Sequence, residues 1–88
     1  MAQVWKFPLA IDGALQPLNL RYGSEILTVQ MQDGVPFLWA IVWNTAPHTD
    51  ERYVRMLGTG WDVPAQQHKY IATVQDGPLV WHFFEVMS

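Results

Sequence analysis

Two segments of the chain place an Asp-Gly dipeptide between apolar runs: "TVQMQDGVPFLWAIVW" at residues 28–43 and "ATVQDGPLVWHFFEV" at residues 72–86. Asp-Gly supplies the positive φ angles that a tight β-hairpin turn requires. The flanking residues are β-branched or aromatic, as is typical of strands. The pattern therefore predicts two hairpins, the first pairing residues 25–32 with 36–43 and the second pairing residues 70–75 with 79–87.

Two further stretches are expected to be strands. Residues 3–8 ("QVWKFP") alternate and would add an edge strand, and residues 52–57 ("RYVRML") alternate charged with apolar side chains. Helix signals are poor, because residues 12–23 have a central Pro and a Gly near each end, and residues 62–69 have room for one turn at most. The expected fold is mainly β, a small antiparallel sandwich or barrel-like sheet of about six strands built from the two Asp-Gly hairpins.

The predicted strand at residues 36–43 is apolar on both faces. Only 15% of the 88 residues are charged, against roughly 25% in typical soluble domains. So small a chain cannot easily cover both faces of its central strands, so either the sheet closes into a barrel or a second copy covers it. A homo-oligomer is therefore expected. One face of this strand carries Phe37, Trp39, Ile41 and Trp43, and the other carries Leu38, Ala40 and Val42.

Composition excludes several classes of protein. The formal net charge of −3, with five Lys plus Arg, provides no basic field for a nucleic-acid polymer. The chain has no cysteine, which fits a reducing cytoplasm. It shows no signal peptide and no apolar run long enough for a membrane span. We expect one β domain over residues 1–88, in the cytoplasm and away from membranes.

One loop stands out as a candidate binding site. Trp61 directly follows Gly58, Thr59 and Gly60, outside any strand pattern. Loop aromatics stack on flat ligands, and small residues let backbone N–H groups approach an anion. An ordinary turn and a structural tryptophan are the alternative interpretation. The candidate ligand-binding residues are Arg55, Gly58, Thr59, Gly60 and Trp61, with Arg52 and Lys69 at the rim because strand alternation sends Arg52 and Arg55 to opposite faces.

Catalytic and metal-binding patterns are absent from the sequence. There is no P-loop and no dinucleotide-binding glycine motif. His48, Asp50 and Glu51 cluster without a second histidine at ligand spacing, so a solvated loop is expected there. Ser24 and Ser88 have no nucleophile-elbow context. We therefore expect a non-enzymatic protein without cofactor or metal, in which His68 lies on the surface and His82 is a satisfied interior or interface residue.

Five segments together resemble a family of small bacteriophage-encoded proteins: "VWKFPL" at 4–9, "VQMQDGVPFLWAIV" at 29–42, "GTG" at 58–60, "YIATVQ" at 70–75 and "LVWHFFEV" at 79–86. In that family a histidine commonly follows the "GTG", where this chain has Trp61. The resemblance implies a host-cytoplasmic protein of the kind that antagonises antiviral defence.

Three functions follow as hypotheses. The first is an oligomeric binder that sequesters a nucleotide-like signalling ligand, with the base stacked on an aromatic side chain and the phosphate held by Arg and backbone N–H groups. The second is a stoichiometric inhibitor of a host defence or metabolic enzyme. The third is a virion or structural accessory domain.

Overall fold

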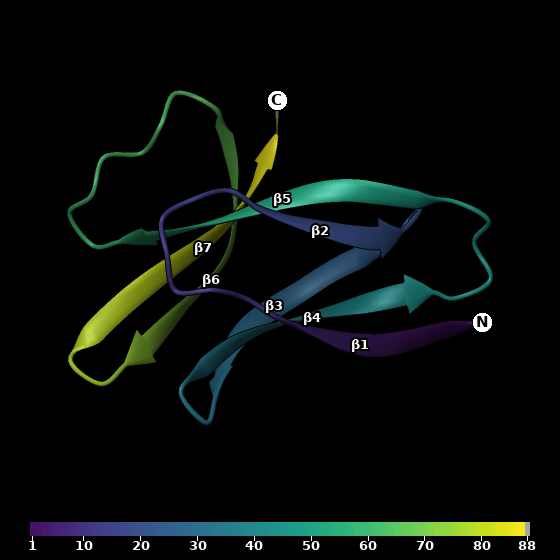
Figure 1. The fold of residues 1–88 in the computed structure, drawn as a ribbon, viewed down its shortest axis with the longest axis horizontal. Helices are drawn as coiled ribbons and strands as arrows, with labels where there is room; N and C mark the ends of the chain where they lie inside the picture. Colours follow the sequence, from purple (N-terminus) through teal and green to yellow (C-terminus); the bar gives the residue numbers. More distant parts are fainter. Residues whose placement is uncertain (88) are drawn as a thin grey trace.

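The computed structural model describes residues 1–87, and all its regular structure is β-strand (Figure 1). The expectation of a mainly β fold is confirmed. The strands are β1 (Ala2–Pro8), β2 (Gln16–Arg21), β3 (Glu25–Gln32), β4 (Val35–Trp43), β5 (Thr49–Gly58), β6 (Gln67–Asp76) and β7 (Leu79–Met87).

These strands form two antiparallel sheets that face each other. Sheet A has the order β1-β4-β3, and sheet B has the order β2-β5-β7-β6. The two hairpins predicted from the sequence are β3–β4 and β6–β7. The first lies in sheet A and the second in sheet B. Of the two architectures expected from the sequence, the structure is the sandwich.

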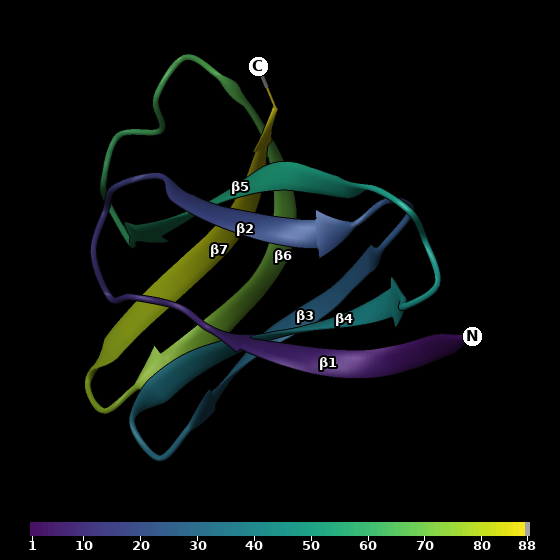
Figure 2. The ribbon, with the colours of Figure 1, turned by 45° about the vertical axis from the view of Figure 1, so that its right-hand side comes forward.

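Both hairpin turns have the backbone conformation that the Asp-Gly dipeptides predict. Gly34 has φ 78° and Gly77 has φ 57°, and Asp33 is also left-handed at φ 52°. The two turns lie at the same end of the molecule in both ribbon views (Figures 1 and 2). Strand β3, at the edge of sheet A, packs against β6, at the edge of sheet B, so the two hairpins are in contact.

The structure has one strand that was not expected among the about six, because residues 16–21 form β2. Pro17 cannot donate a ladder hydrogen bond, which makes this segment look like a breaker in the sequence. In the fold β2 is the edge strand of sheet B and pairs with β5 on one side only, so the missing donor is tolerated.

Strand β5 is also longer than expected. It begins at Thr49, so Asp50 and Glu51 lie in a strand and only His48 lies in the preceding loop. All three side chains are exposed, as expected, although the loop interpretation is wrong for Asp50 and Glu51. Residues 62–66 form a loop without a helical turn.

The core lies between the sheets and is built from alternate residues of the central strands. Leu38, Ala40 and Val42 of β4 face inward and are buried. Their neighbours Trp39 and Ile41 face outward and are half-buried, and Trp43 is 49% exposed. The core cluster comprises Leu9, Val29, Leu38, Ala40, Val42, Val54, Met56, Ala72, Val74 and Phe83.

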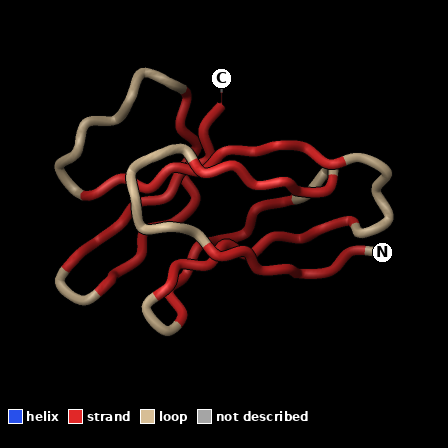
Figure 3. Tube along the Cα trace, in the orientation of Figure 1, coloured by secondary structure: helices blue, strands red, loops and turns tan. Residues whose placement is uncertain are grey.

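The longest loop, residues 59–66, joins β5 to β6 (Figure 3). It begins directly after Gly58, the last residue of β5, and contains Thr59, Gly60 and Trp61. The loop between β1 and β2, residues 9–15, reaches the same region, since Gly13 lies against the Trp61 ring. These two loops frame the candidate site.

Candidate functional site

The Trp61 ring is fixed in place although the residue is 49% exposed. A Cβ atom added to Gly58 would lie 2.7 Å from Trp61 Cε2, so only glycine allows the ring to lie this close to β5. The ring also meets Trp81 edge to face, with centroids 5.9 Å apart. Because its contacts hold the ring while half of the surface stays open, Trp61 offers a preorganised aromatic platform.

The glycine loop itself is a tight turn. The backbone N–H of Trp61 donates to the carbonyl oxygen of Gly58 at 3.1 Å, and Gly60 has φ 87°. The N–H of Trp61 is therefore already used inside the turn. The turn ends β5 and directs Trp61 back toward the end of sheet B.

Beside Trp61 lies a hollow of about 200 Å³. Phe84 and His82 come to it from the outer face of β7, and Thr59 and Gly60 come from the turn. Ligand pockets usually measure about 300–1,000 Å³, so this hollow has room for one planar ring and leaves the rest of a larger ligand outside. Its lining is Leu57, Gly58, Thr59, Gly60, Trp61, Val63, His82 and Phe84.

A chain of hydrogen bonds fixes the polar side of this hollow. His82 Nε2 lies 2.7 Å from Thr59 Oγ1, and His82 Nδ1 lies 3.0 Å from Thr73 Oγ1. Thr73 Oγ1 is in turn 2.9 Å from the Tyr70 hydroxyl. His82 is thus a satisfied, half-buried histidine, and it ties the Thr59 turn to β6.

Arg55 lies on the same outer face, opposite Phe84 in the β5–β7 ladder. Its Nη1 donates to Gln66 Oε1 at 2.8 Å and lies 3.2 Å from His68 Nε2. Within residues 1–87, its Nε and Nη2 groups make no protein hydrogen bond. Because guanidinium N–H groups bind phosphate and carboxylate oxygens well, Arg55 has donors free for an anion next to the hollow.

A second hollow of about 500 Å³ lies on the other side of Trp61. Among the described residues, none of those that line it is charged: they are Gly58, Thr59, Trp61, Pro78, Leu79, Val80 and Trp81. Leu79 is 50% exposed here. This hollow suits an uncharged, apolar group.

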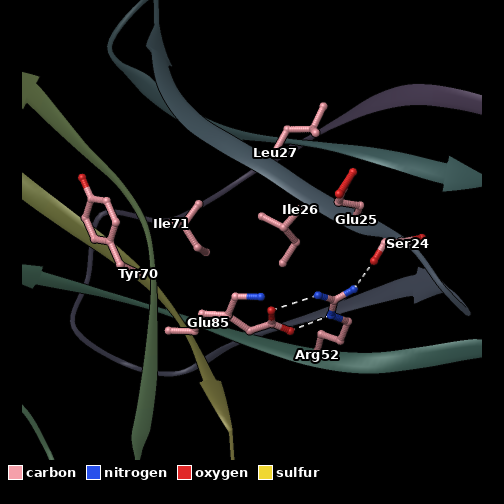
Figure 4. Close-up of a pocket in the computed structure, with 9 residues that line it drawn as sticks. Ser24, Glu25, Ile26, Leu27, Arg52, Tyr70, Ile71 and Glu85 are labelled. Atoms are coloured by element: carbon pink, nitrogen blue, oxygen red, sulfur yellow. Dashed lines mark hydrogen bonds and ion pairs between the residues drawn. The ribbon is translucent and has the colours of Figure 1, made fainter.

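Arg52 is in a different place, inside the sandwich (Figure 4). Its Nε and Nη2 donate to the two carboxylate oxygens of Glu85 at 2.6 and 2.9 Å, and its Nη1 donates to the carbonyl oxygen of Ser24 at 2.6 Å. The hydrogen bond to Glu85 raises the pKa of Arg52. The Arg52 guanidinium is therefore committed to the fold, as a bidentate pair whose carboxylate is almost fully buried.

The pair borders a cavity of about 230 Å³ that opens between β3 and β6. Lys69 lines the same cavity, opposite Glu85 in the β6–β7 ladder. Six residues separate Arg52 from Gly58 along β5, which is about 20 Å of strand. The cavity and the Trp61 loop are therefore separate regions of the molecule.

A family model described as a domain of unknown function, DUF7352, matches residues 1–88. The chain belongs to this family. No curated protein and no solved structure matches the chain significantly. The family description assigns no activity, so the site has to be interpreted from its own geometry.

The structure brings together four of the predicted site residues and separates others from them. Gly58, Thr59, Gly60 and Trp61 line one hollow, with Arg55 opposite Phe84 at its side. Arg52 and Lys69 lie at the other region, so their predicted place at the rim of the loop site is wrong. The predicted alternation is confirmed, since Arg52 faces inward and Arg55 outward.

The sequence interpretation missed His82, Phe84 and Thr73 as parts of this site. The register of the second hairpin contains part of the missing signal, because pairing residues 72–76 with 79–83 places Thr73 opposite His82. The pairing of Tyr70 with Phe84 was hidden, since it depends on a β-bulge between Tyr70 and Ala72. The hydrogen bond between Thr59 and His82 could not be predicted in this way, since it depends on how the turn after β5 folds back.

Neither a metal-binding cluster nor a membrane-spanning helix is present in the described part of the chain, residues 1–87. Among residues 1–87, no group of three or more His, Cys, Asp or Glu side chains is arranged to hold a metal ion. The same part of the chain contains no helix long and apolar enough to cross a membrane.

Proposed function

We propose that this protein is a non-enzymatic binder of a nucleotide-like ligand, which it sequesters at the Trp61 loop. The observation that carries the proposal is the position of Arg55, with unused guanidinium donors, beside a hollow for one planar ring. Aromatic side chains bind bases by stacking, and arginine binds phosphates. A base at Trp61 and a phosphate at Arg55 would use both features together.

The resemblance to bacteriophage proteins gives this binding a biological setting. A protein that binds a signalling nucleotide without catalysing its conversion lowers the concentration of free nucleotide stoichiometrically. In an infected cytoplasm, such a protein would act as an antagonist of host antiviral defence. The ligand class expected in that setting is a cyclic or linear nucleotide.

Calorimetric titration with a panel of cyclic and linear nucleotides tests the proposal. Trp61→Ala should lose roughly 1–3 kcal/mol of binding free energy through lost stacking. Arg55→Ala should weaken binding further, and more strongly at low salt, where the phosphate contact is least screened. Lys69→Ala is the matched control, because it also removes a cation but at the other cavity, and it should bind like the parent. The proposal fails if the parent binds none of the nucleotides.

A second candidate function is favoured by the hollow of about 500 Å³, whose lining lacks charge. It fits an apolar side chain of a partner protein, and tryptophan is a frequent anchor of protein interfaces. Leu79→Lys would introduce a charge into this hollow without touching the smaller one. A host enzyme inhibited by the parent but not by Leu79→Lys would support this function, and unchanged nucleotide binding by the same variant would separate the two.

A further inference from the structure

Strand β1 is an edge strand without a protecting charge. It pairs with β4 on one side, and no strand within residues 1–87 pairs with its other side. Its only charged residue is Lys6, whose Nζ reaches across β4 to Gln32 Oε1 at 2.8 Å and lies 4.6 Å from the centre of the Phe37 ring. The ammonium group is therefore held over the sheet face and away from the edge, where a lysine would normally block strand pairing.

The other edges in the described part of the chain are protected. Strands β3 and β6 pack against each other. Strand β2 has Pro17 within it, which cannot donate to a new partner strand, and Arg21, whose Nη1 donates to the carbonyl oxygen of Ala46 at 3.2 Å. Open strand edges with free N–H and C=O groups are the usual place where a further strand adds to a sheet. In this molecule β1 is that edge.

The surface around β1 is apolar. Strands β1 and β4 contain seven and nine residues, and Lys6 is their only charged one. On β1 Val4 is 60% exposed and Trp5 is 37% exposed. Large exposed apolar patches rimmed by polar residues mark interaction sites in soluble proteins. Sheet A therefore has both free backbone groups and an apolar side-chain surface at the same edge.

The sequence of β1 is complementary to itself in one antiparallel register. A two-fold axis perpendicular to the sheet must pass through a residue, since only then do inward and outward side chains match. If the axis passes through Trp5, all seven residues of β1 face a residue of the second copy, and Lys6 faces Val4. The end pairs of Ala2 with Pro8 each have one hydrogen-bond donor fewer, because proline has no N–H. If the axis passes through Lys6, two ammonium groups would face each other and fewer residues would pair.

We propose that the protein forms a symmetric dimer in which β1 pairs antiparallel with β1 of a second copy, centred on Trp5. The two three-stranded sheets then become one continuous sheet across the dimer. The pairing does not depend on the nucleotide-like ligand, because β1 contributes no residue to the hollows beside Trp61. A contact of one short strand is smaller than a standard protein interface, so we expect a reversible, concentration-dependent dimer.

A pair of substitutions at Val4 tests this register. In the proposed dimer, Val4→Lys places a lysine opposite Lys6 of the other copy twice, and Val4→Glu places a glutamate there instead. Like charges directly opposite destabilise strand pairing and opposite charges stabilise it. In sedimentation velocity at low salt, we expect Val4→Lys to raise the dimer dissociation constant on the order of tenfold. Val4→Glu should dimerise at least as tightly as the parent.

Circular dichroism checks that both variants keep the fold, as expected for a position 60% exposed. A parent that stays monomeric up to several hundred micromolar overturns the proposal. A Val4→Lys variant that dimerises as tightly as the parent overturns it as well, because only a dimer formed elsewhere on the surface would tolerate a new lysine at this edge.

Disulfide trapping provides an independent test, since the chain contains no cysteine. In the proposed register Trp5→Cys brings two Cα atoms to about 4.5–5.5 Å, within disulfide range. Gln3→Cys is the control, because its two copies would be about 13 Å apart along the strands. Mild oxidation should link the Trp5→Cys chains and leave the Gln3→Cys chains unlinked. The register is wrong if the two variants cross-link equally or if only Gln3→Cys does.

Discussion

Two arginines three residues apart on β5 have opposite roles. Arg52 faces inward, and three of its nitrogen atoms donate hydrogen bonds to Glu85 and Ser24. Arg55 faces outward and, within residues 1–87, has guanidinium donors without a protein acceptor beside the hollow at Trp61. Alternation along the strand accounts for the difference in direction. Which arginine is available to a ligand depends on the hydrogen-bond partners that neighbouring strands and loops bring to each guanidinium group.

The Arg52–Glu85 pair provides a prediction about stability. The Arg52 side chain is 23% exposed and that of Glu85 is 8% exposed. Arg52→Met leaves a buried carboxylate without its partner and should lower the free energy of unfolding by about 2–4 kcal/mol, at the lower end of the range for buried pairs because Arg52 is partly hydrated. Urea denaturation measures this loss.

The double variant Arg52→Met, Glu85→Met is the control for that prediction. Because it removes both charges, it should recover much of the stability that Arg52→Met loses. If the double variant is no more stable than Arg52→Met, the loss in the single variant does not come from the unpaired charge of Glu85.

At the scale of strands and turns, the hairpins are determined locally. Gly34 and Gly77 have positive φ angles, and a Cβ atom at either position would meet no atom of another described residue, apart from its chain neighbours, within 4 Å. These positions therefore favour glycine because of their backbone conformation, and not because a side chain would clash with neighbouring atoms. Both turns follow from short-range chemistry that is visible in the sequence.

Replacing either turn glycine with valine should cost on the order of 1 kcal/mol or more, because a β-branched residue resists a left-handed conformation. Asparagine tolerates that conformation better, so Gly34→Asn and Gly77→Asn should lose less stability than the valine variants. Thermal unfolding of the four variants gives the comparison. Valine variants as stable as the parent would show that these turns do not need positive φ.

The same distinction explains what the sequence could predict. The four hairpin strands and the left-handed glycines depend on neighbouring residues, so they were predictable. Strand β2 was not, because Pro17 is acceptable only at a sheet edge that the sequence does not reveal. The partners Glu85 for Arg52 and His82 for Thr59 were also hidden, since they depend on the pairing of β5 with β7 and on the path of the turn after β5.

For the molecule as a whole, the two-sheet arrangement buries one face of each sheet and leaves apolar side chains on the other. The sequence predicted this surplus, because residues 36–43 are apolar on both faces, and it left a closed barrel or a second copy as the explanation. The sandwich covers Leu38, Ala40 and Val42 but not Trp43 or Val4. The uncovered surface adjoins the free edge of β1. The Trp61 loop is a separate feature, because no residue of β1 lines the hollows beside it.

Native mass spectrometry after incubation with an equimolar mixture of nucleotides tests the central claim, ligand binding at the Trp61 loop, most directly. We predict that the parent protein retains one nucleotide per chain, and that Trp61→Ala retains much less of the same nucleotide while its charge-state distribution stays that of a folded protein. A parent spectrum without any nucleotide adduct, or equal retention by Trp61→Ala, would contradict this account.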